Sequence, residues 1–157
     1  MNMLKWLNNK KKDNKGFSLV ELIIVVAIMA ILVGLLAPQY LKYVEKSRKS
    51  ADAANLDEMV QAVQVYAADA ETTLPAGTYE ITISASGTEV TDNAILKAAL
   101  NEAVPGYATT TLKSNKWNTD NGNASYIKAT ITVAQDGGTT VAYEPASFAT
   151  YVNKTAK

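Results

Sequence analysis

A long apolar stretch constrains this chain more than any other feature of its sequence. No side chain is polar from Leu22 to Ala37, and the longer run 17–37 adds only Ser18 and Glu21 as polar residues. As an α-helix, the run from 17 to 37 extends about 31 Å, which matches the hydrocarbon thickness of a bilayer. We therefore expect a helix that lies in a membrane or in an equally apolar assembly.

Positive charge precedes this run. Residues 1–16 contain five Lys and one Asp, a net charge of +4, and such a charge keeps an N-terminus on the cytoplasmic side. An ordinary secretory signal would have a shorter apolar core and a small-x-small cleavage site, whereas here the run leads into PQYLKYVEKSRKS. On hydropathy alone, a simple signal-anchor remains an alternative.

Glu21 is an ionisable residue inside the apolar run, and it has two interpretations. Near the cytoplasmic end of the helix, its side chain can extend to the lipid headgroups. A carboxylate at membrane depth also needs a cationic partner, and no Lys or Arg occurs between Phe17 and Pro38. Cleavage after Gly16 would create an α-amino group at Phe17. The charge pattern therefore suggests proteolysis followed by packing of the helix against copies of itself.

The composition argues against several functional classes. The chain has no Cys and no His, so it lacks thiol nucleophiles, disulfides, the commonest metal ligand and the usual general base. It has no phosphate-binding loop, and its formal net charge of zero does not suggest nucleic acid as a partner. We predict no enzymatic activity, no catalytic residue, no metal site and no cofactor.

The start of the chain resembles type IV pilins and the related pseudopilins. The resemblance rests on K-G-F-S-L-V-E at Lys15–Glu21, the apolar run, and Pro38-Gln39-Tyr40, and it extends to about Lys49. It implies that a prepilin peptidase cuts between Gly16 and Phe17 and N-methylates Phe17. It also implies that Glu21 neutralises the N-terminus of a neighbouring subunit during filament assembly.

This resemblance carries expectations about function and location. The precursor would be a single-pass protein of the cytoplasmic membrane, and the assembled form a homo-oligomeric helical filament at the cell surface. Its partners would be the peptidase, the pilus assembly machinery and, before assembly, the bilayer. The fibre would serve adhesion, twitching motility or biofilm formation. A type II secretion pseudopilin is the alternative, and a plain signal-anchored surface protein is a further one.

Gly34 and Pro38 weaken the apolar helix near its end. Proline removes one backbone donor and clashes with the carbonyl four residues earlier, which belongs to Gly34. Glycine costs the helix about 1 kcal/mol relative to Ala. The pair either forms an ordinary kink at the membrane exit, or loosens when subunits pack into a fibre. Because similar pilins lose helix in this region, we favour the second interpretation.

Beyond Pro38 the helix becomes amphipathic. Its apolar residues recur at three- and four-residue steps, and the stripe consists of Leu56, Met59, Val60, Val63, Tyr66, Ala67 and Ala70. Asp52 and several other polar residues lie mostly off that stripe, and Glu45 and Lys49 are spaced as a favourable i, i+4 ion pair. We expect the helix to continue to about Ala70 and to end before Pro75 and Gly77.

The C-terminal part is predicted to form a β-rich head. Alternation predicts a strand at 79–84 and a hairpin of 126–134 with 139–143, and we also expect a strand at 109–113. Thr91 or Asp92 is predicted to cap a short helix at 93–103. The chain is thus α+β: a long helix, first apolar and then amphipathic, packed against an antiparallel sheet as in pilins. The expected parts are a leader (1–16), the apolar helix (17–38), the amphipathic half (39–75) and the head (76–157).

The head contains a polar loop at 114–125. Its Asp120, Asn121 and Asn123, together with Asp136, offer oxygen ligands for calcium, but turn chemistry explains them equally well and their spacing fits no EF-hand. Trp117 in this loop is expected to be a half-buried lid over the sheet.

Overall fold

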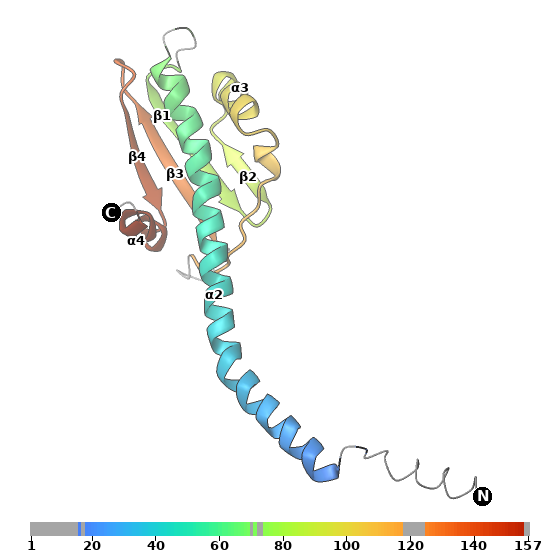
Figure 1. Cartoon of the computed structure of the whole chain (residues 1–157). Helices are drawn as coiled ribbons and strands as arrows, with labels where there is room; N and C mark the ends of the chain where they lie inside the picture. Colours follow the sequence, from blue (N-terminus) through green and yellow to red (C-terminus); the bar gives the residue numbers. More distant parts are fainter. Residues whose placement is uncertain (1–15, 17, 70, 72–73, 118–124, 156–157) are drawn as a thin grey trace, which may run out of the picture. The chain divides into compact units, whose positions relative to one another are not determined.

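The predicted α+β fold is confirmed by a computed structural model, which describes residues 16, 18–69, 71, 74–117 and 125–155 (Figure 1). Two compact units divide the chain, Met1–Val44 and Glu45–Lys157. The described elements, in chain order, are α2 (Leu19–Ala68), β1 (Gly77–Ser84), β2 (Gly87–Val90), α3 (Ala94–Ala103), the 3-10 turn η1 (Tyr107–Thr109), β3 (Tyr126–Val133), β4 (Thr139–Glu144) and α4 (Ala146–Thr155).

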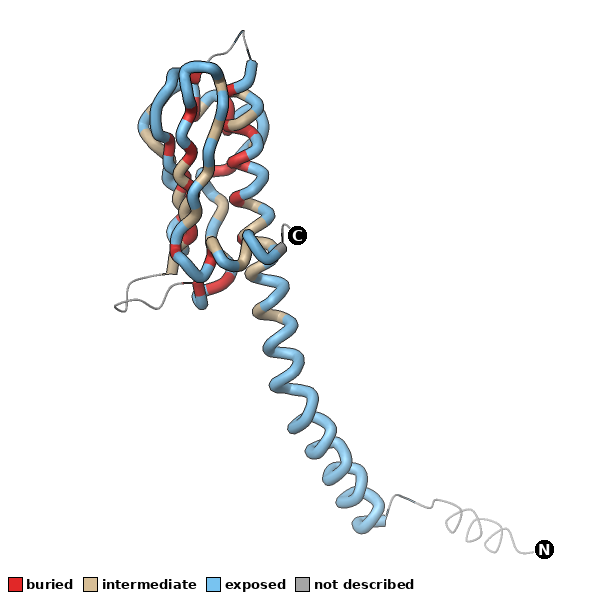
Figure 2. The backbone as a smooth tube through the Cα atoms, turned by 90° about the vertical axis from the view of Figure 1, so that its left-hand side faces the viewer, coloured by how far each residue is buried: buried red, intermediate tan, exposed pale blue. Residues whose placement is uncertain are grey.

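The first unit consists of the N-terminal part of α2. Every described residue from Ser18 to Tyr43 is exposed, and Figure 2 shows this part of the helix in one colour throughout. The large apolar side chains are no exception, with exposed fractions from 47% at Val25 to 74% at Leu19. Of the helices that the structure describes, α2 alone is long and apolar enough to cross a membrane. Nothing within the described chain covers this apolar surface.

The second unit has a hydrophobic core between the later part of α2 and the sheet. The predicted stripe is confirmed for Leu56, Met59, Val60, Val63 and Ala67, all of which are buried in one cluster with side chains of β1 and β3. Tyr66 is only partly buried, and Ala70 lies outside the described residues.

A four-stranded antiparallel sheet forms the opposite wall of this core, in the order β2-β1-β3-β4. The alternation that predicted β3 is confirmed, because Ile127, Ala129, Ile131 and Val133 are buried and the residues between them are not. In the predicted hairpin, Ala129 pairs with Tyr143 and Ile131 with Val141.

Several local predictions were wrong. The stretch predicted as a strand at 109–113 instead ends η1 and continues without strand structure, although Leu112 donates its N–H to the Ser84 carbonyl at 3.0 Å. Asn93 caps α3, in place of Thr91 or Asp92, since its side chain accepts from Leu96 N at 3.0 Å.

The predicted limits of the long helix also need correction. Helix α2 ends at Ala68 and not at about Ala70, so the stretch assigned to its amphipathic half (39–75) includes residues outside the helix.

The predicted Glu45–Lys49 ion pair is absent from the described side chains. Glu45 accepts a hydrogen bond from the Ser114 hydroxyl, and Lys49 Nζ lies 4.6 Å from the centre of the Trp117 ring.

Candidate functional site

The N-terminus of α2 is closed by a reciprocal pair of hydrogen bonds between Ser18 and Glu21. Glu21 N donates to Ser18 Oγ at 3.2 Å, and Ser18 N donates to Glu21 Oε2 at 3.4 Å. The backbone bond from Leu22 N to the Ser18 carbonyl, at 3.1 Å, starts the helical ladder. This is a capping box, in which two otherwise unpaired N–H groups of the first turn are satisfied by side chains. The cap explains why α2 begins at Leu19.

The capping box orients the Glu21 carboxylate toward the proposed cleavage point. Its Oε2 atom accepts from the Ser18 N–H, and that nitrogen belongs to the peptide bond formed with Phe17. Cleavage before Phe17 would therefore place a new ammonium group one residue from a carboxylate that already faces this end of the helix. A carboxylate has two oxygens and several lone pairs, so Glu21 can keep its cap and accept a further donor. Phe17 itself lies outside the described residues.

Gly16 has no steric role that the structure shows. A side-chain carbon added at this position would have no heavy atom within 4 Å, and the residue is exposed. Its backbone does not adopt the left-handed conformation that favours glycine. No contact with the described residues requires a glycine at this position.

Helix α2 continues through both Gly34 and Pro38. Pro38 lies inside the helix, so the Gly34 carbonyl cannot receive the N–H that residue 38 would normally supply. A side-chain carbon added to Gly34 would also have nothing within 4 Å. Both residues weaken the helix, and neither is required by a contact within the described chain.

A family profile matches this same segment. The prokaryotic N-terminal methylation motif matches residues 11–37, a range that includes Gly16, Phe17, Glu21 and Gly34. The chain carries the type IV prepilin cleavage and methylation signature.

The prepilin signature explains the exposed, apolar and capped start of α2. Chains with this signature are pilin-like or pseudopilin precursors that a prepilin peptidase processes, and the long apolar α2 is consistent with a membrane-anchored precursor. The signature is typical of structural subunits and not of enzymes. It ends at residue 37, and neither a search of curated proteins nor a search of solved structures found a match to the chain.

In the head of this prepilin-like chain, a buried carboxylate joins distant segments. The Asp52 side chain, 1% exposed, accepts from Lys113 N at 2.7 Å, from Ser114 N at 2.9 Å and from Trp117 Nε1 at 2.9 Å. Charge-assisted bonds of this kind are stronger than neutral ones. Asp52 therefore fixes the segment that follows η1 against α2.

Trp117 extends this network to the C-terminal helix. It is 2% exposed and not the half-buried lid that the sequence predicted, and its carbonyl accepts from the Ser147 hydroxyl. Its ring makes edge-on contacts with Phe148 at 4.9 Å and Tyr151 at 5.3 Å between centroids. Such aromatic pairs stabilise a core by about 1 kcal/mol beyond the area they bury. Asp52 and Trp117 together hold α2, the loop and α4 as one body.

The sequence did not predict this network, and the helical pattern gave little signal for it. Asp52 looks like one of several polar residues beside the apolar stripe, and its partners lie 61 to 65 positions away. The capping box, by contrast, had a readable signal, because Ser-x-x-Glu before an apolar run is its usual pattern.

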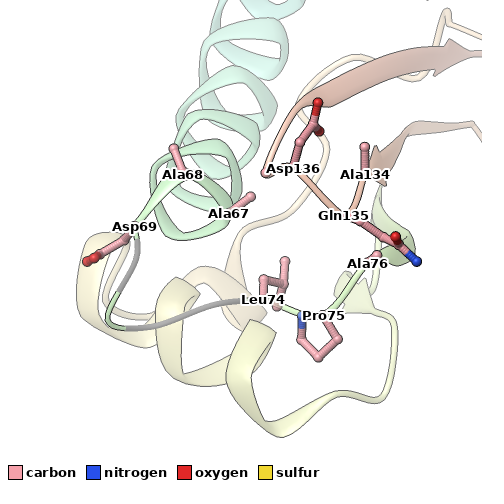
Figure 3. A pocket seen from close by; sticks show the side chains of 10 residues that line it. Ala67, Ala68, Asp69, Leu74, Pro75, Ala76, Ala134, Gln135 and Asp136 are labelled. Carbon is pink, nitrogen blue, oxygen red and sulfur yellow. The ribbon is translucent and has the colours of Figure 1, made fainter.

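A hollow of about 420 Å³ lies where α2 ends beside the β3–β4 turn (Figure 3). Two acids at its rim, Asp69 and Asp136, accept from the backbone N–H groups of Glu71 and Gly138, each at 2.9 Å. Figure 3 shows their side chains pointing away from each other. Within the described ranges, no three acidic residues are grouped to hold a metal ion. The calcium ligands considered at Asp120, Asn121 and Asn123 lie outside the described residues.

Charge pairs on the sheet have a structural role. Lys128 Nζ lies 3.1 Å from Glu144 Oε2 and 3.5 Å from Glu80 Oε1, and thereby links β3 to both neighbouring strands. The hydrogen bond with Glu144, with help from Glu80, raises the pKa of Lys128 above its ordinary value. The lysine stays charged at neutral pH and offers no acid–base chemistry there.

Proposed function

We propose that this chain is the structural subunit of a type IV pilus. The peptidase cuts between Gly16 and Phe17, Phe17 is N-methylated, and the apolar helices then pack into the core of a surface fibre with the heads outside. The methylation signature, followed by an apolar helix that no described part of the chain covers, carries this proposal. The fibre would act in adhesion, twitching motility or biofilm formation.

Assembly in this proposal depends on Glu21. Transfer of an apolar helix from lipid into a helix bundle exchanges one apolar medium for another, so burial of apolar area contributes little free energy. Packing and polar pairs must then decide which helices associate. Glu21 is the one acidic residue between Phe17 and Pro38, and the new amine of a neighbouring subunit would be its partner.

Gly34 and Pro38 would allow the helix to adapt during assembly. Both weaken α2 at a point where the isolated chain has no contact that requires them. We expect the stretch 34–38 to lose helical hydrogen bonds when subunits pack, and a fibre map with an unbroken helix there would contradict this part of the proposal.

Replacing Gly16 by Val is expected to stop processing. A branched side chain at the cleavage position blocks close approach of the peptidase backbone, while the open space around Gly16 leaves the fold unaffected. The uncut chain should accumulate in membranes, and fibres containing it should disappear. Intact-mass measurement of the membrane fraction and electron microscopy of the cells test this.

The control for this experiment is Gly34→Ala, a glycine change inside α2 and away from the cleavage position, which should still be cut after Gly16. If the Gly16→Val chain is recovered as fibres of normal length, the processing step is wrong. Short assemblies confined to the cell envelope in the unmodified strain would instead favour the type II secretion pseudopilin.

A further inference from the structure

The exposed face of α2 in the second unit carries opposite charges at its two ends. Lys46, Ser50, Ala54, Asp57 and Gln61 follow one another at three- and four-residue steps, so they lie on one face of the helix, and all are exposed. This face is opposite the buried stripe that packs against the sheet. A basic end and an acidic end are thus separated by small side chains.

The charges around this face are segregated along the chain in the same way. Lys46, Arg48 and Lys49 precede Ser50, with Glu45 as the one acid among them. From Ser50 to Leu96 every charged residue is acidic: Asp52, Asp57, Glu58, Asp69, Glu71, Glu80, Glu89 and Asp92. The helix therefore has a basic segment followed by an acidic one.

The exposed charges on and beside this face, Lys46, Asp57 and Glu58, have no ion-pair partner among the described residues. The ion pairs between described residues are Lys97–Asp92 and those that Lys128 makes with Glu80 and Glu144, and none of them is on this face. The Asp57 carboxylate accepts a hydrogen bond only from the Gln61 side chain, at 2.7 Å. Lys46 and Asp57 cannot pair within one chain, because they are eleven positions apart in a helix, a rise of about 17 Å. Each end is free to bind a charge of opposite sign on another molecule.

We propose that the basic end of this face, at Lys46, binds the acidic end, at Asp57 and the neighbouring Glu58, of a second copy of the chain. The partner carries the matching charges on the same helix. In the proposed fibre the helices run parallel, so each copy keeps one unused end of either sign, and the contact is heterologous and repeats into an open filament; an antiparallel pair would use both ends and close as a dimer. This inference rests on the proposed fibre and specifies which head surfaces meet in it.

Reversal of charge tests the pairing. Lys46→Glu places a negative charge opposite Asp57 of the partner, and we expect fibre yield to fall at least about tenfold, since like charges across an interface cost several kcal/mol. Asp57→Lys should have the same effect. The double variant Lys46→Glu/Asp57→Lys restores opposite charges at every contact, and its yield should return to within about twofold of the unmodified chain. Lys154→Glu, an exposed reversal on α4, is the matched control and should change little.

Disulfide trapping tests the geometry independently. The chain has no Cys, so Lys46→Cys/Asp57→Cys introduces the only thiols, and their separation in one helix rules out a bridge within one chain. Oxidised fibres of this variant should give a ladder of covalent oligomers on a non-reducing gel, whereas either single variant should remain monomeric.

The outcomes separate this inference from the proposed function. A ladder together with rescue by the double reversal supports the head-to-tail contact. Fibres that form normally in all reversal variants and give no ladder overturn it, while leaving the pilus proposal intact. A chain that is never found in fibres, even unmodified, overturns both.

Discussion

Fibres should be lost when Glu21 is replaced by Gln, although cleavage after Gly16 continues. Glutamine keeps a side-chain oxygen that can accept the Ser18 N–H, so the capping box survives. It removes the charge that would pair with the amine of a neighbouring Phe17. Loss of one partner of a buried ion pair costs about 3–5 kcal/mol, and even the lower figure reduces assembly at least about 100-fold. Quantifying the chain in sheared fibres, relative to membranes, measures this.

Two further variants separate charge from helix capping. Glu21→Ala removes both and should fail to assemble as completely as Glu21→Gln. Ser18→Ala retains the carboxylate but removes the hydroxyl that accepts from Glu21 N, which costs the helix about 1 kcal/mol and should leave fibres in place. If Glu21→Gln assembles normally and Ser18→Ala does not, then Glu21 acts as a helix cap and the charge mechanism is wrong.

The second large effect is expected at Asp52. Replacement by Ala leaves two buried donors, the Ser114 N–H and the Trp117 indole, and the partly buried N–H of Lys113 without their acceptor. Each unsatisfied buried donor costs about 1–3 kcal/mol, so we expect a loss of about 3–5 kcal/mol in the free energy of unfolding of the head. The midpoint of thermal unfolding should fall by at least about 10 °C.

Fluorescence of Trp117 follows this unfolding directly. The chain has two tryptophans, and Trp6 precedes the cleavage point, so the cleaved chain in detergent has a single reporter at the network itself. Asp52→Asn keeps one acceptor oxygen and should give an intermediate loss. Asp57→Ala removes an exposed acid from the same helix and should change stability by less than about 0.5 kcal/mol. Equal stabilities of the Asp52→Ala and Asp57→Ala chains would show that the network does not hold the head together.

The sequence predicted those helices and strands whose apolar residues form a pattern within the element itself. The amphipathic stripe around Leu56 and Val63 and strand β3 each bury one face, so their periods were readable. The apolar run was readable from its length and its lack of polar side chains. The methylation signature was readable for a different reason, since an outside enzyme must recognise it in a fixed order of residues.

The elements that were missed depend on contacts made after folding. Strand β2, at Gly87–Val90, is four residues long and is defined by its pairing with β1, from Ile81 to Ser84. Helix α4 contains residues with modest helix propensity, and Phe148, which is fully buried against Trp117, holds it in place. Asp52 belongs to the same class, because its role appears only when residues 113–117 fold back onto α2.

The most direct test of the account is the intact mass of this chain recovered from sheared surface fibres. We predict a species that begins at Phe17, lacks residues 1–16 and carries one added methyl group on its terminal nitrogen. A chain that still begins at Met1, and is found only in the membrane fraction, would contradict the account.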